Sequence, residues 1–106
     1  VVTDCSEAPQ LKALAEDCEA VAQWMASEAS LDDKLAGSVP FCTMAATAVA
    51  GWQLLRQARD GGGSEAKTVV ARYFAEHLAP EARGLKTAAM AGSELLYALD
   101  AAALAG

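Results

Sequence analysis

One histidine and three cysteines are the residues whose types could support catalysis or metal binding. The thiols belong to Cys5, Cys18 and Cys42, and the single imidazole belongs to His77. A histidine on a bundle helix can carry a phosphoryl group, but that transfer needs an exposed ring and a nearby lysine, and no lysine follows His77 within a turn. We therefore expect a structural role for His77, bonded to a carbonyl freed by Pro80 or to a carboxylate, with phosphotransfer as the alternative.

Metal and nucleotide sites lack the motifs that they require. A di-iron bundle uses Glu-x-x-His pairs on facing helices, and the sequence contains no such pair. The cysteines and the histidine show no zinc-ligand spacing. The three glycines at 61–63 follow a helical pattern rather than a strand, unlike a phosphate-binding loop. No tight turn presents a serine nucleophile. The sequence thus predicts no catalytic, cofactor-binding or metal-binding residue in this chain.

The thiols form no disulfide framework, because their number is odd. Cys5 and Cys18 on one helix would lie about 20 Å apart, which is too far for a bridge. A Cys18–Cys42 pair across two helices remains an alternative. We expect reduced, buried thiols in a cytoplasmic protein.

The elements that position these residues are helices. The 106 residues include 26 alanines, 12 leucines and 7 valines but no isoleucine and no asparagine, a composition that favours helices and disfavours strands. The length suits one domain. The net charge of −6 disfavours nucleic-acid binding. Residues 1–50 carry eight acids against two lysines, which we interpret as a solvated helix face.

Two helices are predicted in the first half. The first begins near Ser6, fades at residues 27–30 and is followed by a loop over residues 31–37. The second begins at residues 38–40, with Ser38 as cap, and ends at Arg59. Gly51 offers a smooth strip for close helix packing, and Trp52 is expected to anchor the core, with Trp24 more exposed. The two apolar stripes are Leu11, Leu14, Cys18, Val21 and Met25, and Phe41, Ala45, Ala48, Trp52 and Leu55.

The uncharged stretch from Leu35 to Leu55 is long enough to span a membrane. Glycine, proline, threonine and glutamine interrupt it, and its alanines make it only mildly apolar. A central bundle helix is therefore the preferred interpretation.

The third helix is predicted over residues 64–91, kinked at Pro80. The apolar phase survives the proline, which a loop would not require. Two shorter helices broken at Pro80 are the alternative. Residues 93–99 can form a short capped turn, and residues 101–106 are expected to fray. The predicted stripe is Val70, Phe74, Leu78, Ala82, Leu85 and Ala89.

These elements predict an all-α fold. Short loops make consecutive helices antiparallel neighbours, which gives an up-and-down bundle of three long helices plus a short C-terminal helix. If the chain breaks at Pro80, the alternative is a four-helix bundle. Residues 1–106 are interpreted as a single domain, and the first residue, Val1 rather than methionine, suggests a fragment of a longer chain.

Three strings of the sequence resemble a known helical domain. They are FCTMAATAVAGWQLL at 41–55, KTVVARYFAEHLAP at 67–80 and AGSELLYAL at 91–99. Together they resemble the extreme C-terminal domain of a subgroup of bacterial acyl-CoA dehydrogenases that includes 3-methylmercaptopropionyl-CoA dehydrogenase. Ala50 departs from the Gly-Gly-Trp step of that domain. The resemblance covers about residues 10–100, and the string at 67–80 is its specific part.

The resemblance implies a function for the parent chain. A complete member is an FAD-dependent flavoprotein of fatty acid metabolism that removes two hydrogens across Cα–Cβ of an acyl-CoA. Its flavin site and catalytic glutamate lie in a preceding dehydrogenase core, so this cytoplasmic fragment would hold neither. Its partners would be that core, a second subunit of a homo-oligomer, or both, with no nucleic acid and no membrane. A free-standing helical interaction module is the alternative. The matching positions, expected to be structural, are Gly51, Trp52, Arg72, Tyr73, Phe74, Glu76, His77 and Pro80.

Overall fold

The computed structural model describes residue 5, residues 7–60 and residues 64–106, and these residues form helices and turns without a strand. The all-α prediction is confirmed. The first two long helices are α1, Pro9–Ser27, and α2, Leu31–Asp60. The third long segment is built from α3, Glu65–Tyr73, the π-helical turn η2, Phe74–Leu78, α4, Ala79–Arg83, and α5, Lys86–Ala89. The 3-10 turn η3, Glu94–Leu96, and the short helix α6, Ala101–Ala105, follow.

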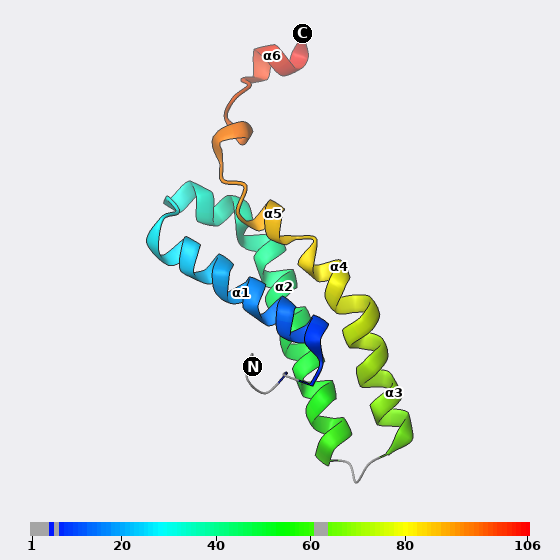
Figure 1. Cartoon of the computed structure of the whole chain (residues 1–106). Helices are drawn as coiled ribbons and strands as arrows, with labels where there is room; N and C mark the ends of the chain where they lie inside the picture. Colours follow the sequence, from blue (N-terminus) through cyan, green and yellow to red (C-terminus); the bar gives the residue numbers. More distant parts are fainter. Residues whose placement is uncertain (1–4, 6, 61–63) are drawn as a thin grey trace.

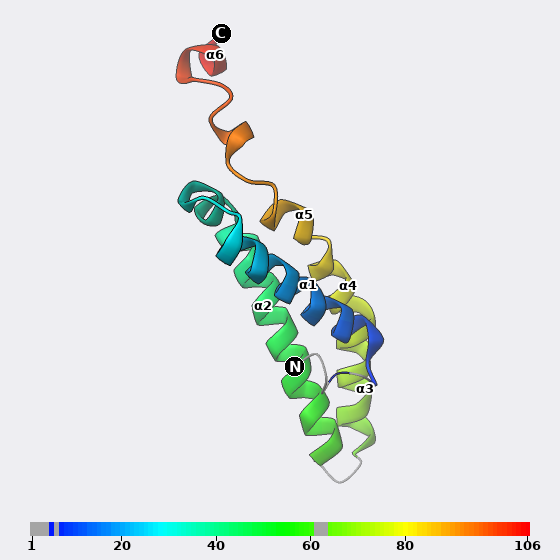
Figure 2. The ribbon, with the colours of Figure 1, turned by 60° about the vertical axis from the view of Figure 1, so that its left-hand side comes forward.

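The three long segments form an up-down-up bundle around α2. Helix α2 runs the length of the bundle, α3 to α5 return alongside it, and α1 lies across part of this pair (Figure 1). Helix α1 contacts α2, η2, α4 and α5. The molecule measures 61 × 30 × 15 Å, and its radius of gyration of 17.2 Å exceeds the roughly 13 Å of a compact chain of this length. The molecule is therefore elongated, in part because the C-terminal end extends beyond the helices, and one side of α2 stays uncovered (Figure 2).

Helix α2 begins at Leu31, so the predicted loop over residues 31–37 is wrong. Ser30 and Asp33 form a reciprocal cap: each backbone N–H donates to the other side chain at 3.2 Å. This capping box satisfies donors that a helix start would leave unpaired. Ser38, the expected cap, instead donates its hydroxyl to the Leu35 carbonyl at 2.9 Å. Pro40 lies within the helix.

The third segment passes Pro80 without a loop, as predicted. Pro80 has no N–H and its ring pushes away the carbonyl of Glu76. The chain widens into the π-helical turn η2 just before the proline, and Ala79 donates its N–H to the Phe74 carbonyl. A second irregularity is a turn at Gly84 and Leu85. Because α4 and α5 continue in the direction of α3 rather than folding back, the four-helix alternative is wrong (Figure 1).

The buried stripe of the third segment differs from the predicted one before Pro80. Ala71, Ala75 and Ala79 are buried there, whereas Val70 is 53% exposed and Leu78 is 39% exposed. Small side chains let the backbones approach closely, and the bulkier neighbours are displaced outward. Beyond Pro80 the predicted phase is confirmed at buried Ala82, half-buried Leu85 and buried Ala89.

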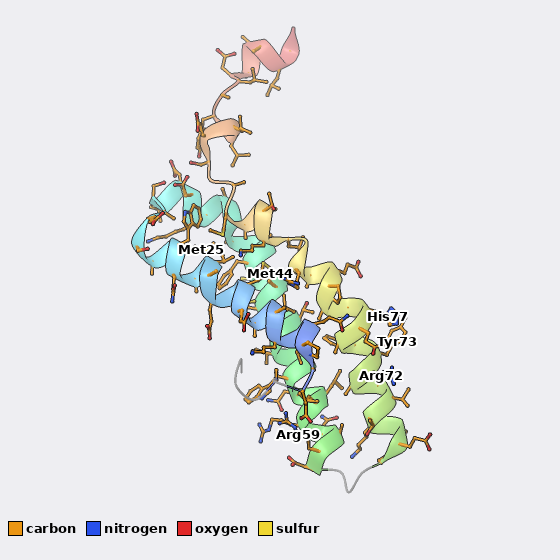
Figure 3. All side chains as sticks on the ribbon, in the orientation of Figure 1. Met25, Met44, Arg59, Arg72, Tyr73 and His77 are labelled. Atoms are coloured by element: carbon orange, nitrogen blue, oxygen red, sulfur yellow. The ribbon has the colours of Figure 1, made fainter. Side chains whose placement is uncertain are left out.

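Glycines of α2 permit the close packing of the core. A Cβ on Gly51 would lie 2.6 Å from Leu11 Cδ1 and 3.0 Å from Phe74 Cε1, which confirms the smooth strip predicted there. Met44 is fully buried, near the interior side of α2 (Figure 3). Trp52, the predicted anchor, packs against the core but remains partly exposed, and Trp24 is also partly exposed. The fully buried large side chain of α2 is Met44.

The ends of the bundle depart from the sequence expectations. Ser6 lies outside the described residues, and Ala8 occupies the N-cap position of α1 without a side-chain cap. Residues 101–105, which were expected to fray, form α6, because Asp100 accepts the Ala103 N–H at 2.8 Å. The segment from Ser93 onward leaves the bundle as an extended arm (Figure 1).

Candidate functional site

His77, the first candidate for chemistry, lies on the outer surface of η2. Its ring centroid is 4.6 Å from that of Tyr73, with the planes inclined by 38°. Both rings point away from the bundle (Figure 3). Within the part of the chain that the structure describes, the imidazole makes no hydrogen bond, so the expected bond to a carbonyl or a carboxylate is wrong. The i, i+4 spacing across the π turn stacks the ring on Tyr73 instead.

The neighbouring charged residues of the same surface pair with each other. Arg72 Nε donates to Glu76 Oε1 at 2.8 Å, and this contact raises the pKa of Arg72 above its ordinary value. Both side chains are exposed. The strongly basic guanidinium and its partner therefore form an ordinary helix-surface pair rather than an acid/base site.

Asp17 is a buried charge that the sequence analysis missed. It is 8% exposed and accepts from Arg83 Nε at 2.7 Å and Lys86 Nζ at 3.5 Å, so one carboxylate joins α1 to α4 and to α5. The hydrogen bond to Asp17, followed by its charge, raises the pKa of Arg83. The spacing Leu14, Asp17, Val21 places Asp17 on the buried face of α1, and this signal could have identified it.

The thiols occupy three different environments. No disulfide joins the cysteines: Cys5 is buried, Cys18 is half-buried and Cys42 is exposed. The expectation of a buried thiol is thus wrong for Cys42. Burial, and then the charge of Asp17, raise the pKa of Cys18. Its thiol is therefore held in the protonated, less nucleophilic form.

Asp33 holds the start of the C-terminal arm. Its Oδ1 accepts the Ser93 N–H at 2.8 Å and the Ser93 hydroxyl at 2.9 Å. These bonds, with those from Ser30, lower the pKa of Asp33. Gly92 turns the chain with a φ of 78°, a conformation that favours glycine. The arm therefore departs from the N-terminal end of α2.

Apolar side chains on the solvent side of α2 form an uncovered surface along the helix. We name this set the outer stripe. By length and composition alone, helix α2 is long and apolar enough to cross a membrane. Only 22% of its most apolar 18-residue stretch is buried in the bundle. The outer stripe consists of Leu31, Leu35, Val39, Cys42, Ala46 and Val49, all of them exposed.

A second uncovered surface is a groove between α2 and the η2–α4 segment, which we name the α2–α4 groove. Thr43 and Thr47 line one wall, but their hydroxyls already donate to the carbonyls of Val39 and Thr43. The opposite wall is largely apolar and includes Phe74, Leu78 and Leu85. The described residues contain no group of three or more histidine, cysteine or carboxylate side chains that could hold a metal ion. The open surfaces thus suit packing rather than chemistry.

Comparison with known families assigns the chain. The family model described as acetyl-CoA dehydrogenase C-terminal like matches residues 5–100, which is most of the sequence. The chain belongs to the acetyl-CoA dehydrogenase C-terminal-like family. The resemblance on the three sequence strings is thereby confirmed at the level of the family. No curated protein and no solved structure matches the chain.

The string at 67–80 in this C-terminal-like domain divides between an inner and an outer face. Phe74 packs against Gly51 at the contact between η2 and α2. The other matching side chains of the third segment lie on the surface. These are Arg72, Tyr73, Glu76, His77 and Pro80, all exposed.

Proposed function

We propose that this chain is the C-terminal accessory domain of an FAD-dependent acyl-CoA dehydrogenase, with a role in packing and no active site of its own. The family match over residues 5–100 is the observation that carries the proposal. The parent would be an oxidoreductase acting on the Cα–Cβ bond of an acyl-CoA. Its subgroup would be the one that includes 3-methylmercaptopropionyl-CoA dehydrogenase.

The roles of the chemistry-bearing side chains support an accessory function. Asp17 neutralises two cations between helices, Asp33 accepts the Ser30 N–H at the start of α2, and His77 stacks on Tyr73. None of these groups faces an enclosed cavity together with a second reactive group. The uncovered outer stripe and α2–α4 groove support a role in which other protein surfaces complete the fold, because large contiguous apolar patches are unusual on isolated soluble domains.

The proposal also covers the location of the active site, the cellular compartment and the assembly of the parent enzyme. We place FAD and the acyl-CoA in a dehydrogenase core of the same polypeptide, in a cytoplasmic homo-oligomer. The partners of this domain would be that core, a second subunit, or both. A free-standing interaction module remains the alternative, and it predicts that no dehydrogenase core is encoded upstream of Val1 in the native reading frame.

Flavin binding and activity test the first part of the proposal. We expect the 106-residue chain to bind no FAD in a fluorescence titration and to oxidise no acyl-CoA with an artificial electron acceptor. The matched control is the polypeptide that contains both the upstream core and this domain, which should be yellow and active. Stoichiometric flavin in the isolated chain would overturn the assignment of the active site to the core.

Association with the core tests the packing role. We expect the separately expressed core and the 106-residue chain to co-elute in size-exclusion chromatography. An unrelated acidic helical bundle of similar size is the control. Failure to co-elute, with both parts folded by circular dichroism, would favour the free-standing module.

A further inference from the structure

The middle of helix α2 carries no charged residue on any side, although the bundle covers only one side of the helix. No charged residue occurs between Leu35 and Leu55. A helix with this property is normally buried on every face. The buried residues Gly37, Met44 and Gly51 lie on one side. The outer stripe lies on the opposite side, since successive residues advance by about 100° around a helix. Its large members are Leu31, Leu35, Val39 and Val49, which are 70%, 63%, 75% and 48% exposed.

The spacing of the outer stripe matches a helix-pairing seam. Five of its members are separated by four, three, four and three residues, which is the a/d repeat of a two-stranded coiled coil. Leu31 extends the seam by one turn at its start. From Leu31 to Val49 the stripe is about 27 Å long, at 1.5 Å per residue. The five seam residues are Leu35, Val39, Cys42, Ala46 and Val49.

We propose that the outer stripe binds the outer stripe of a second copy of this chain, in an antiparallel α2–α2 pair about a twofold axis. The inference rests on the packing role proposed above and names the partner of one surface. The distribution of side-chain size along the stripe favours this occupant, because the leucines lie at its start and the small residues Cys42 and Ala46 lie in its second half. An antiparallel pair sets Leu35 against Ala46 of the second copy, and Val39 against Cys42 of the second copy.

Size complementarity also argues against a parallel pair. Parallel helices would place Leu35 against Leu35 of the second copy and Ala46 against Ala46. Some layers would then contain two large side chains and others two small ones. The antiparallel arrangement gives layers of more even volume, as close packing requires.

Charge supports the same arrangement. Two copies with a net charge of −6 repel each other, but the five seam residues are uncharged, so the Leu35–Ala46 and Val39–Cys42 layers bring no two carboxylates together. An anionic membrane is disfavoured, because Asp32 and Asp33 flank the start of the stripe, where a membrane surface would attract cations. A single helix pair of this length lies at the lower end of specific interfaces. We therefore expect a dimer whose population depends on concentration.

Sedimentation velocity of the 106-residue chain tests the pairing. We expect a monomer–dimer equilibrium that Val39→Glu weakens by at least about 100-fold in Kd, because a carboxylate would be buried against an apolar layer. Val39 is 75% exposed in one copy, so the fold should survive, and circular dichroism checks this. The matched control is Val69→Glu on α3, whose wild-type side chain is 58% exposed and which should leave the Kd unchanged.

Charge exchange tests the antiparallel register. Leu35→Lys and Ala46→Glu should each weaken the dimer, and the double variant should recover most of the loss, since the two new charges meet only across an antiparallel pair. A short bis-maleimide should also link two copies through Cys42, and Cys42→Ser should prevent this. In a parallel pair the double variant would instead place like charges together and show no recovery.

Several results would overturn the proposal. These are a wild-type chain that stays monomeric at all concentrations, a dimer insensitive to Val39→Glu, and a monomer that instead floats with anionic vesicles. A stripe that becomes protected from hydrogen exchange only when the dehydrogenase core is added would assign it to the core. The two proposals can be contradicted independently. A monomeric chain that co-elutes with the core would contradict the pairing but support the accessory role. A dimeric chain that does not bind the core would support the pairing but contradict the accessory role.

Discussion

The two faces of α2 differ in a way that reverses the usual pattern. On the inner face, the buried residues other than Met44 are small: Gly37, Ala48 and Gly51. The outer face carries large aliphatic side chains that are exposed, among them Leu35 and Val39. On the inner face, small size lets α1 and the third segment approach closely. On the outer face, bulk remains available for a surface that this copy of the chain does not supply.

This difference shows that the burial of a residue in this chain depends on the distance between packed helices as much as on the hydrophobicity of the side chain. Alanines are buried along the third segment while Val70 and Leu78 remain exposed. Hydrophobicity alone would have selected the valine and the leucine. Substitutions on the two faces of α2 should therefore have opposite consequences: inner changes act on stability, and outer changes act on association.

Truncation of Met44 should have the largest effect on stability. Met44→Ala removes a fully buried side chain, and we expect a loss of about 2–5 kcal/mol in the free energy of unfolding. Val39→Ala on the outer face is the matched control and should change stability by less than about 0.5 kcal/mol. Urea denaturation monitored by circular dichroism, below the concentration at which dimers form, gives both values. Equal losses for the two variants would contradict the contrast between the faces.

Neutralising Asp17 should have the next largest effect. Asp17→Asn weakens two charge-assisted hydrogen bonds between α1 and the third segment, and we expect a loss of about 1.5–3 kcal/mol. Glu16→Gln is the control, since its exposed pair with Lys12 at 3.8 Å should contribute less than about 0.5 kcal/mol. Thermal unfolding at low and moderate salt measures both. An Asp17→Asn variant as stable as the wild type would show that the buried carboxylate contributes no net stability.

Filling the space at Gly37 should have a smaller effect. A Cβ at this position would overlap the backbone carbonyl of Ala89. Overpacking is destabilising by about 1–3 kcal/mol, whereas alanine gains at most about 1 kcal/mol of helix propensity, so Gly37→Ala should be a net loss. Gly51→Ala meets the flexible end of Leu11 and should be tolerated better. If Gly37→Ala proved the more stable of the two in denaturant titrations, α5 would have to pack less closely on α2 than described.

The smallest expected effect is a pH dependence of the Asp33–Ser93 contact, which holds the start of the C-terminal arm. The pKa of Asp33 lies below its ordinary value of 3.8, so its stabilising bonds are present above that value and are lost as the pH falls through the lowered pKa. An NMR titration should place the Asp33 midpoint below 3.8, and the Ser93 amide should lose its protection over the same range. Ser93→Ala removes the hydroxyl donor and should move the midpoint partly upward. If Asp33 titrated at its ordinary pKa, the Asp33–Ser93 contact would not hold the start of the arm in solution.

Asp17 and Cys42 show which features of the candidate surfaces the sequence did not predict. Glu16 and Glu19 were expected to be solvated and are exposed, but Asp17, between them, is buried. Its partners lie 66 and 69 residues away in the chain, so only the packing of α1 on α4 and α5 brings them together. Similarly, Cys42 was expected to be buried, as reduced cysteines usually are. Its exposure depends on which side of α2 the other helices occupy.

The sequence by itself determined the class of fold, the number of long helices, the passage of the third segment through Pro80 and the family. These follow from composition, from apolar periodicity and from strings of residues that are local in the chain. Only the tertiary structure decided that α2 begins at Leu31 and that the buried stripe before Pro80 runs through Ala71, Ala75 and Ala79. The physical reason is that periodicity identifies apolar faces but does not state how closely two helices approach. In this bundle the glycines and alanines at the contacts set that distance. Large side chains on the opposite side of α2, such as Leu35 and Val39, stay exposed.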